Sequence, residues 1–264
     1  IATRDAKKLA GDWTSIQGNF GPPGGHVETS HLKQYTDYRQ LIADPDVDLV
    51  DVCLPTDSHF RVVMECLEAG KPVLVEKPIS VSQQEAETMV RTAAEKRVPL
   101  FVAHVLPFFP EFRFAAEAIQ DQRYGRLLAA NFKRVIARTE WSSDMSDFRK
   151  LGGWGIDLHI HDNHFIAHAC GRPTGVFSRG LLQDGLVNHV HTSYLYADGP
   201  AVTCVCGGIG AKALQFARTS GDQGVVLRDV LYSPQFQVEL QRFVLLDVVG
   251  RPANEVIVDG FVVG

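Results

Sequence analysis

Short apolar runs alternate with longer amphipathic stretches along the first part of the chain. Residues 48–54, 73–75 and 98–102 are almost entirely apolar, which is typical of parallel strands that are covered on both faces. Between them lie two stretches with apolar residues at helical spacing, one ending at Gly70 and one over residues 82–96. This alternation predicts a right-handed βαβ array, which is half of a doubly wound parallel sheet.

Polar residues and glycine mark the ends of the predicted helices. Asp57 or Ser58 is expected to cap the first long helix, because their side-chain oxygens accept hydrogen bonds from free backbone N–H groups. Gly70 stands where a left-handed residue ends that helix. Shorter helices are expected over residues 5–10 and 38–43. The apolar face of the helix over 82–96 is expected to hold Ala86, Met89, Val90 and Ala93.

After residue 105 the pattern changes to one helical stretch followed mainly by alternating, strand-like runs. A helix is expected over residues 110–122, and residues 127–138 alternate loosely. The fold class is therefore predicted as α/β: a dinucleotide-binding Rossmann domain over 1–105, then an α+β domain over 106–264 with a large, mostly antiparallel sheet. The later strands are expected at 175–182, 189–196, 201–206, 214–219 and 225–228.

Composition narrows the class of protein. Hydrophobic residues make up 45% of the 264 residues and charged residues 22%, as in ordinary globular domains. The net charge of −5, without a Lys/Arg-rich block, argues against a nucleic-acid partner. A membrane span needs about 18 consecutive apolar residues, and the sequence has no such run. The five scattered cysteines, among them Cys53, Cys204 and Cys206, are interpreted as reduced core residues of a cytoplasmic protein.

Polar residues follow each of the three predicted parallel strands. The segments are Pro55-Thr56-Asp57, Glu76-Lys77-Pro78 and Ala103-His104, and doubly wound sheets bind ligands beyond this edge. A lysine at a strand end tolerates burial when a substrate oxygen or a carboxylate meets its ammonium group. Lys77 is therefore a candidate ligand-binding residue. The alternative is a simple surface ion pair between Glu76 and Lys77.

A second candidate lies in the stretch LGGWGIDLHIHDNHFIAHACG, residues 151–171. A helix is expected from about residue 155 to 169, so that Asp157 and His161, four apart, share one face. A carboxylate beside an imidazole fixes its orientation and raises its basicity. Asp157 and His161 are therefore a candidate general acid–base pair.

These segments together carry a family resemblance. CLPTDSH (53–59), GKPVLVEKP (70–78) and GGWGIDLHIHD (152–162) occur in this order. The sequence resembles the Gfo/Idh/MocA family of NAD(P)-dependent oxidoreductases, which includes glucose–fructose oxidoreductase and inositol dehydrogenase. The resemblance implies hydride transfer between a nicotinamide and a hydroxyl or carbonyl carbon of a sugar, polyol or related small molecule.

The resemblance also implies residue roles. Lys77 would bind the substrate hydroxyl, and Asp157 with His161 would form the substrate-binding and catalytic pair. The residues expected at the cofactor are Thr3, Arg4, Pro55, Thr56, His59, Glu76, Lys77, His104 and Trp154. For Trp154, packing at the domain junction is an equal alternative. A homodimer or homotetramer is expected, because the open sheet of the second domain commonly forms the interface in such proteins.

The start of the chain departs from the family pattern. A glycine-rich phosphate loop is expected before Ile1 in the complete protein, since Ile1 to Asp5 resemble the end of the second strand. Arg4 at that strand end suits a ribose 2′-phosphate, which favours NADP over NAD. The alternative is that Arg4 is a solvated residue at a helix start.

Two rival readings remain open from the sequence. HIHDNH (159–164) with His168 superficially resembles the ligands of a zinc-dependent hydrolase, but His161, His164 and His168 form a helical stripe rather than a loop site. No metal is therefore expected. The second rival is a non-catalytic relative that only binds a nucleotide.

Overall fold

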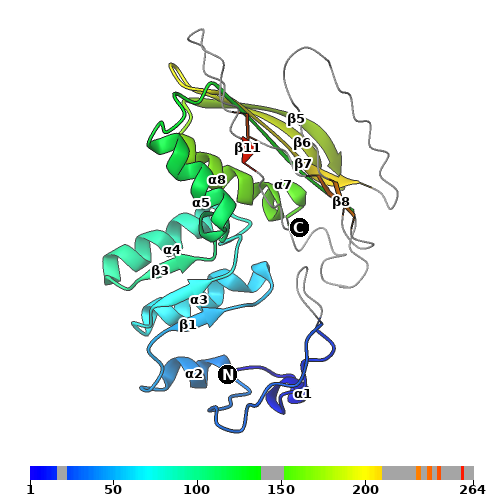
Figure 1. Ribbon diagram of the computed structural model, residues 1–264. Helices are drawn as coiled ribbons and strands as arrows, with labels where there is room; N and C mark the ends of the chain where they lie inside the picture. The colour runs from blue at the N-terminus through cyan, green and yellow to red at the C-terminus, as the bar shows by residue number, and fades with distance from the viewer. Residues whose placement is uncertain are drawn as a thin grey trace. The chain divides into compact units, whose positions relative to one another are not determined.

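The computed structural model describes residues 1–16, 23–137 and 152–209, with four short strands after residue 229. The chain divides into two compact units, Ile1–Ala103 and His104–Gly264 (Figure 1). The strands predicted at 214–219 and 225–228 lie outside the described residues. No helix within the described ranges is long and apolar enough to cross a lipid bilayer.

The first unit is built on a three-stranded parallel sheet. Its strands are β1 (Val50–Val52), β2 (Val73–Val75) and β3 (Leu100–Val102), in the order β1-β2-β3. Both neighbouring pairs are parallel. The predicted parallel βαβ array is therefore confirmed, with β1 and β3 shorter than their apolar runs.

Helix α3 (His59–Glu68) connects β1 to β2 and buries Val62, Val63, Cys66 and Leu67. The predicted cap is wrong, because α3 has no side-chain cap hydrogen bond. A 3-10 turn, η1 (Thr56–Ser58), leads into the helix instead. Gly70 follows the helix with φ of +73°, the left-handed conformation that was expected.

Helix α4 (Gln83–Lys96) connects β2 to β3 and begins at Ser82, whose side chain accepts from the Glu85 N–H. Met89 and Ala93 are buried as predicted, but Val90 is 58% exposed and Thr92 is buried instead. The reason is geometric, because Val90 lies about 100° around the helix from Met89. The sheet therefore covers a narrower stripe of α4 than predicted, and this stripe is centred on Met89.

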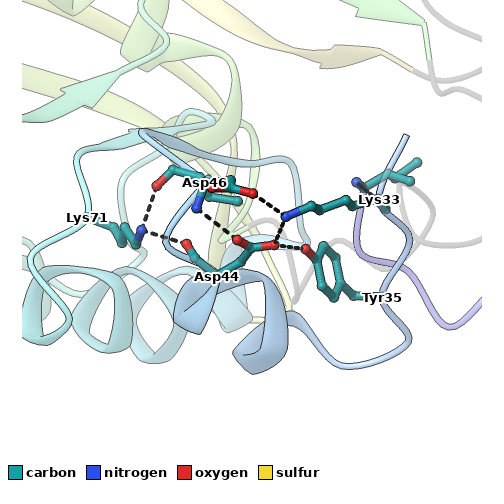
Figure 2. A network of polar contacts seen from close by, with 7 residues as sticks. Lys33, Tyr35, Asp44, Asp46 and Lys71 are labelled. Carbon is teal, nitrogen blue, oxygen red and sulfur yellow. Dashed lines mark hydrogen bonds and ion pairs between the residues drawn. The ribbon is translucent and has the colours of Figure 1, made fainter. Parts of the chain in front are cut away.

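A polar network, shown in Figure 2, joins the N-terminal segment to the turn after α2 (Tyr38–Ala43). The Asp44 carboxylate accepts from Lys33 Nζ at 2.9 Å and from the Tyr35 hydroxyl, and Lys33 also reaches Asp46 at 2.6 Å. Lys71 Nζ donates to the Asp44 carbonyl oxygen at 2.8 Å. Ala2 forms a parallel bridge with Tyr35. The network therefore holds the start of the chain next to the turn after α2.

The second unit has a four-stranded mixed sheet in the order β4-β7-β6-β5. The strands are β4 (Ala129–Ala137), β5 (Gly175–Gln183), β6 (Leu186–Leu195) and β7 (Ala201–Ile209). The β5–β6 and β6–β7 pairs are antiparallel, as expected, whereas β4 and β7 are parallel. Two antiparallel strand pairs follow: β8 (Val230–Tyr232) with β9 (Gln237–Glu239), and β10 (Phe243–Val244) with β11 (Ile257–Val258).

Helices α5 (Pro110–Gln120) and α8 (His159–Cys170) lie on one side of this sheet (Figure 1). The short turn η2 (Leu106–Phe108) precedes α5. Phe165 of α8 is fully buried and meets Phe112 of α5 edge to face, with ring centroids 4.8 Å apart. The sheet contributes Phe132, Val202 and Cys204 to the same core.

The helix predicted over 155–169 is divided into α7 (Trp154–Asp157) and α8 at Leu158. Leu158 has φ −102° and ψ −48°, and the His161 N–H bonds to the Leu158 carbonyl, only three residues back. Gly153 enters α7 with φ of +79°, and a Cβ there would lie 2.8 Å from the Val187 carbonyl oxygen. Close approach of β6 therefore requires glycine at the entry to α7.

The five cysteines are all free. Cys66, Cys204 and Cys206 are buried as predicted, and Cys170 is half-buried. Burial raises the pKa of the Cys66 thiol to about 12, which keeps it protonated and unreactive at neutral pH. The core assignment of Cys53 is wrong, because β1 ends at Val52 and the next side chain is exposed.

Candidate functional site

Lys77 lies just beyond the carboxyl end of β2, the central strand of the parallel sheet. The Glu76 N–H donates to the Val52 carbonyl at 3.1 Å, so the ladder to β1 continues one residue past β2. The Glu76 carboxylate accepts from the Lys77 backbone N–H at 3.2 Å. Lys77 is half-buried, Pro78 is fully buried, and the bond between them is cis.

His59 fastens this loop to the loop after β1. Its Nδ1 lies 3.0 Å from the Pro78 carbonyl oxygen and its Nε2 lies 2.8 Å from that of Leu54. The side chain is only 1% exposed. The ring expected to line a dinucleotide is therefore enclosed, and it shapes the two loops rather than presenting a surface to a ligand.

Pro55 and Thr56 lie on the loop that His59 anchors. Pro55 is exposed, Thr56 is half-buried, and the Pro55 carbonyl accepts from the Ser58 N–H at 2.9 Å. Because α3 lacks a side-chain cap, backbone N–H groups of its first turn are left to other acceptors. An edge with these groups and Lys77 suits an anionic, oxygen-rich ligand such as a dinucleotide.

Thr3 and Arg4 lie beyond the Ala2–Tyr35 bridge. The Asp5 side chain caps helix α1 (Ala6–Leu9), accepting from the N–H groups of Lys7 and Lys8. The Asp5 N–H donates to Thr3 Oγ1 at 3.2 Å, and Arg4 is exposed. The Asp5 carboxylate, which is the nearest one to Arg4 in sequence, therefore binds backbone N–H groups at the start of α1.

In the second unit, Asp157 and His161 lie on either side of the break at Leu158. Asp157 is the last residue of α7 and is 6% exposed, and His161 is half-buried near the start of α8. The prediction that both residues share one face of a continuous helix is therefore wrong. Their combined role stays a prediction.

His104 stacks on His164, with ring centroids 4.1 Å apart and planes 5° from parallel. His168 continues the column at 6.5 Å from His164. Burial, and then the neighbouring His168, lower the pKa of His164. The sequence placed His104 at a strand end and His164 in a helical stripe, but nothing in either pattern linked the two.

Trp154 is a core residue. It is 4% exposed and packs with Ile136, Leu158, Val190 and Cys206. A Cβ at Gly208 would lie 2.1 Å from the indole nitrogen, so the ring lies directly on that glycine. Trp154 therefore packs within the core of the second unit.

A buried ion pair between Arg134 and Asp162 was missed by the sequence reasoning. Arg134 Nε and one terminal nitrogen donate to the two Asp162 oxygens, both at 2.9 Å, and the side chains are 3% and 5% exposed. One signal was available, because Arg134 stands between Phe132 and Ile136 at an inward position of an alternating strand. A charge at such a position requires a buried partner.

The ligand atoms of His159, Asp162 and Cys204 lie within 4.8 Å of one another. Both oxygens of Asp162 are already occupied by the Arg134 guanidinium, which also repels a cation. Burial raises the pKa of the Cys204 thiol far above its ordinary value, whereas zinc binds the thiolate. These residues do not fit a metal, and nothing supports the zinc-hydrolase reading.

His159 instead belongs to a buried hydrogen-bond chain. Its Nε2 lies 3.0 Å from Thr192 Oγ1 and 3.3 Å from the Tyr194 hydroxyl. Tyr194 also donates to Asn163 Oδ1. These bonds, with the Arg134–Asp162 pair, fix the first turns of α8 on the sheet.

Comparison with known proteins finds a family model that matches most of the first unit. Residues 20–104 match the oxidoreductase family GFO_IDH_MocA, described as having an NAD-binding Rossmann fold. This similarity supports a Gfo/Idh/MocA oxidoreductase. The matched segment contains the whole β1-β2-β3 sheet and Lys77, so the similarity covers the part of the fold that carries the candidate lysine.

Two curated Gfo/Idh/MocA-like relatives have assigned activities. The chain is 28% identical over 211 residues to trans-1,2-dihydrobenzene-1,2-diol dehydrogenase of Mus musculus, covering 76% of this chain and 61% of that protein. It is 32% identical over 130 residues to myo-inositol 2-dehydrogenase of Thermotoga maritima, covering 49% and 38% respectively. The chain thus spans less than two thirds of the length of these relatives.

A solved relative shares the fold. Scyllo-inositol dehydrogenase of Lactobacillus casei, in a structure with NAD(H) and scyllo-inositol, matches with a TM-score of 0.56 at 21% identity. The match covers 67% of this chain and 55% of that one. At this identity the likeness concerns the fold.

Proposed function

We propose that this protein is an NAD(P)-dependent dehydrogenase or reductase that acts on a CH–OH or carbonyl group of a sugar, polyol or related small molecule. The observation that carries the proposal is the position of Lys77, half-buried beyond the carboxyl end of the central parallel strand. Ligands of such sheets bind at this edge. The names of the two dehydrogenase relatives point to the same class of substrate.

The proposed roles follow from the chemistry of three side chains. Bound NAD(P) would supply the C4 atom that accepts or gives the hydride. Lys77 would donate a hydrogen bond to the substrate oxygen and stabilise its developing negative charge. His161 would take the hydroxyl proton, and Asp157 would orient the imidazole and raise its basicity.

The proposed cofactor contacts divide into direct and supporting ones. Pro55, Thr56 and Glu76 would contact the dinucleotide directly, and His104 would border the nicotinamide or substrate. His59 would support them by holding the Leu54 and Pro78 carbonyls in place. Trp154 is left out of the set because it is buried.

Between the two cofactors, NADP is favoured. Arg4 is exposed next to Thr3 at the end of the first strand-like segment. The Asp5 carboxylate accepts from the Lys7 and Lys8 N–H groups, so it is not offered to a ribose 2′-hydroxyl. A guanidinium without a competing carboxylate suits a 2′-phosphate.

A homodimer or homotetramer in the cytoplasm completes the proposal. Strand β5 is an edge strand with large apolar side chains exposed, among them Phe177 at 57%, Leu181 at 67% and Leu182 at 69%. Exposed apolar patches on sheets mark association surfaces. The five free cysteines suit a reducing compartment. Light scattering with size exclusion should give a mass above that of one chain.

The experiment is an assay of the full-length protein with NAD or NADP and a panel of inositols, sugars and dihydrodiols, following reduced nicotinamide by absorbance. Lys77→Met should abolish turnover, because it removes the ammonium group and keeps the length of the side chain. Cofactor affinity, measured by fluorescence titration, should change little. Arg4→Gln should weaken NADP and leave NAD unchanged.

Lys96→Met is the matched control, since Lys96 lies on α4 and pairs with Glu68 at 2.7 Å on the surface. It should keep full turnover. Undiminished turnover in Lys77→Met would remove the proposed mechanism. Tight cofactor binding by the wild type without turnover of any substrate would favour the non-catalytic, nucleotide-binding reading.

A further inference from the structure

Strand β6 carries two histidines on the sheet face opposite α8. Val190, Thr192 and Tyr194 of β6 are buried toward the helices, so the alternating residues His189 and His191 project from the other face. The Nε2 atoms of these two rings are 3.3 Å apart, and the ring centroids are 5.2 Å apart.

This separation matches the spacing of two ligands on one metal ion. Imidazole nitrogens bind Zn²⁺ at about 2.0–2.1 Å, which in a tetrahedral site places two of them roughly 3.3–3.4 Å apart. A ring nitrogen pair at that distance needs little rearrangement to hold an ion. Imidazole ligands suit zinc, copper and nickel among the common divalent ions.

The backbone around His189 explains why its ring takes this position. His189 lies opposite Gly207 of β7. A Cβ at Gly207 would lie 2.5 Å from His189 Nδ1, so the imidazole occupies the space that the missing side chain leaves. His189 is half-buried and His191 is exposed, which leaves the converging nitrogens open to solvent on one side.

Charge around the pair sets limits on affinity. Burial, then His191 and Lys133, lower the pKa of His189, so the ring is neutral at neutral pH, as metal binding requires. Lys133 also repels a bound cation. Arg179 of β5 lies opposite His191 in the strand register. Its guanidinium carbon lies over the Phe177 ring, 5.6 Å from the ring centroid.

We propose that His189 and His191 bind one divalent late first-row metal ion, Zn²⁺, Ni²⁺ or Cu²⁺, on the outer face of the β4-β7-β6-β5 sheet. Water completes the coordination, since two protein ligands leave positions open. The site is separate from His159, Asp162 and Cys204, which lie buried on the inner face. It shares this face with Phe177 and Leu181 of β5, which belong to the proposed association surface, and it does not depend on the proposed redox activity.

The test is titration of the full-length protein with Zn²⁺ by calorimetry, and with Cu²⁺ by electron paramagnetic resonance. The wild type should bind one ion per chain, with a Cu²⁺ spectrum that reports two imidazole nitrogens. His191→Ala should weaken binding by about 100-fold, since joining two ligands on one scaffold raises affinity by roughly 10²–10⁴-fold. His191 is exposed, so this variant should keep the fold.

A matched control keeps two histidines on the strand but separates them. The double variant His191→Ala, Ser193→His places the second ring on the same face about 13 Å from His189 along the strand. It should bind as weakly as His191→Ala. Unchanged Zn²⁺ affinity in either variant, or a wild-type Cu²⁺ spectrum with a single imidazole, would overturn the proposal and leave an N–H···N hydrogen bond as the meaning of the contact.

Discussion

Arg134 and Asp162 illustrate how one buried charge dictates its partner. The pair is almost wholly removed from water, and its attraction is opposed by the cost of desolvating both ions. Burial alone would lower the pKa of Arg134, but the Asp162 carboxylate beside it outweighs that effect, so the pKa of Arg134 is raised. The pair therefore matters more because it fixes the position of α8 than because it adds net stability.

Removing one partner should be far more damaging than removing both. Arg134→Met leaves Asp162 as an uncompensated buried carboxylate, which should lower the free energy of unfolding by about 3–5 kcal/mol. The double variant Arg134→Met, Asp162→Leu replaces the pair with apolar groups and should lie closer to the wild type. Urea denaturation of the three proteins measures the differences.

Lys133→Met is the control for loss of a positive charge on the same strand, because Lys133 is only half-buried. It should change stability much less than Arg134→Met. A double variant that is less stable than Arg134→Met would contradict the argument, since it would give the pair a net stabilising value.

Single residues differ in how far the sequence reveals them. Lys77 was predicted at a strand end because the apolar run and the following proline fix its place locally. His59 and Trp154 were assigned to the cofactor, yet the first is enclosed by the Leu54 and Pro78 carbonyls and the second lies on Gly208. Pro78 and Gly208 are distant in sequence from the rings that they contact, so no local pattern indicates these contacts.

Asp44 connects the N-terminal segment to the rest of the first unit. Hydrogen bonds from Tyr35, Lys33 and the Asp46 N–H hold its pKa far below the ordinary value. In Figure 2 the side chains of Lys33 and Tyr35 converge on this one carboxylate. The network therefore holds residues 33–35 in place, and through them the start of the chain.

Asp44→Ala should loosen the pairing between the chain's first residues and residues 33–35. The Thr3 N–H bonds to the Tyr35 carbonyl at 3.0 Å, and the Tyr35 N–H bonds to that of Ile1 at 2.9 Å. Both amides should exchange faster with deuterium in the variant, because the opening of this pairing becomes easier. Amides of α4 should be unaffected.

Asp46→Ala is the matched control, since Asp46 pairs with Lys33 through a side chain that is 74% exposed. Exposed pairs contribute little, so exchange at Thr3 and Tyr35 should stay near that of the wild type. Equal acceleration in both variants would show that Lys33, and not Asp44, organises the segment.

Secondary structure was predicted well where one local pattern decides it. The parallel strands and α2, α3 and α4 follow from apolar runs, helical spacing and Gly70, which act over a few residues. The break at Leu158 was missed, because periodicity continues across it while β6 approaches Gly153 from the side. The parallel β4–β7 pairing likewise depends on tertiary packing rather than on either strand's own sequence.

The whole molecule carries several histidines that burial keeps neutral. Burial lowers the pKa of His159, His164 and His189 in the folded state. The unfolded chain takes up protons at these rings near pH 6.5, its ordinary value, while the folded chain takes them up only at lower pH. Between these values the unfolded state binds more protons, so stability is full above about pH 6.5 and falls as pH decreases.

His159→Gln tests this dependence at the most buried of the three histidines, which is 6% exposed and bonded to Thr192. The amide can keep a hydrogen bond to the threonine but cannot be protonated. The free energy of unfolding, measured by urea titration across pH 5 to 8, a range chosen around the ordinary pKa of about 6.5, should therefore fall less steeply on acidification. His31→Gln, at an exposed position of the first unit, should keep the wild-type slope. If His159→Gln and the wild type lost stability equally between neutral pH and pH 5, protonation of the unfolded chain at His159 would not be a cause of acid sensitivity.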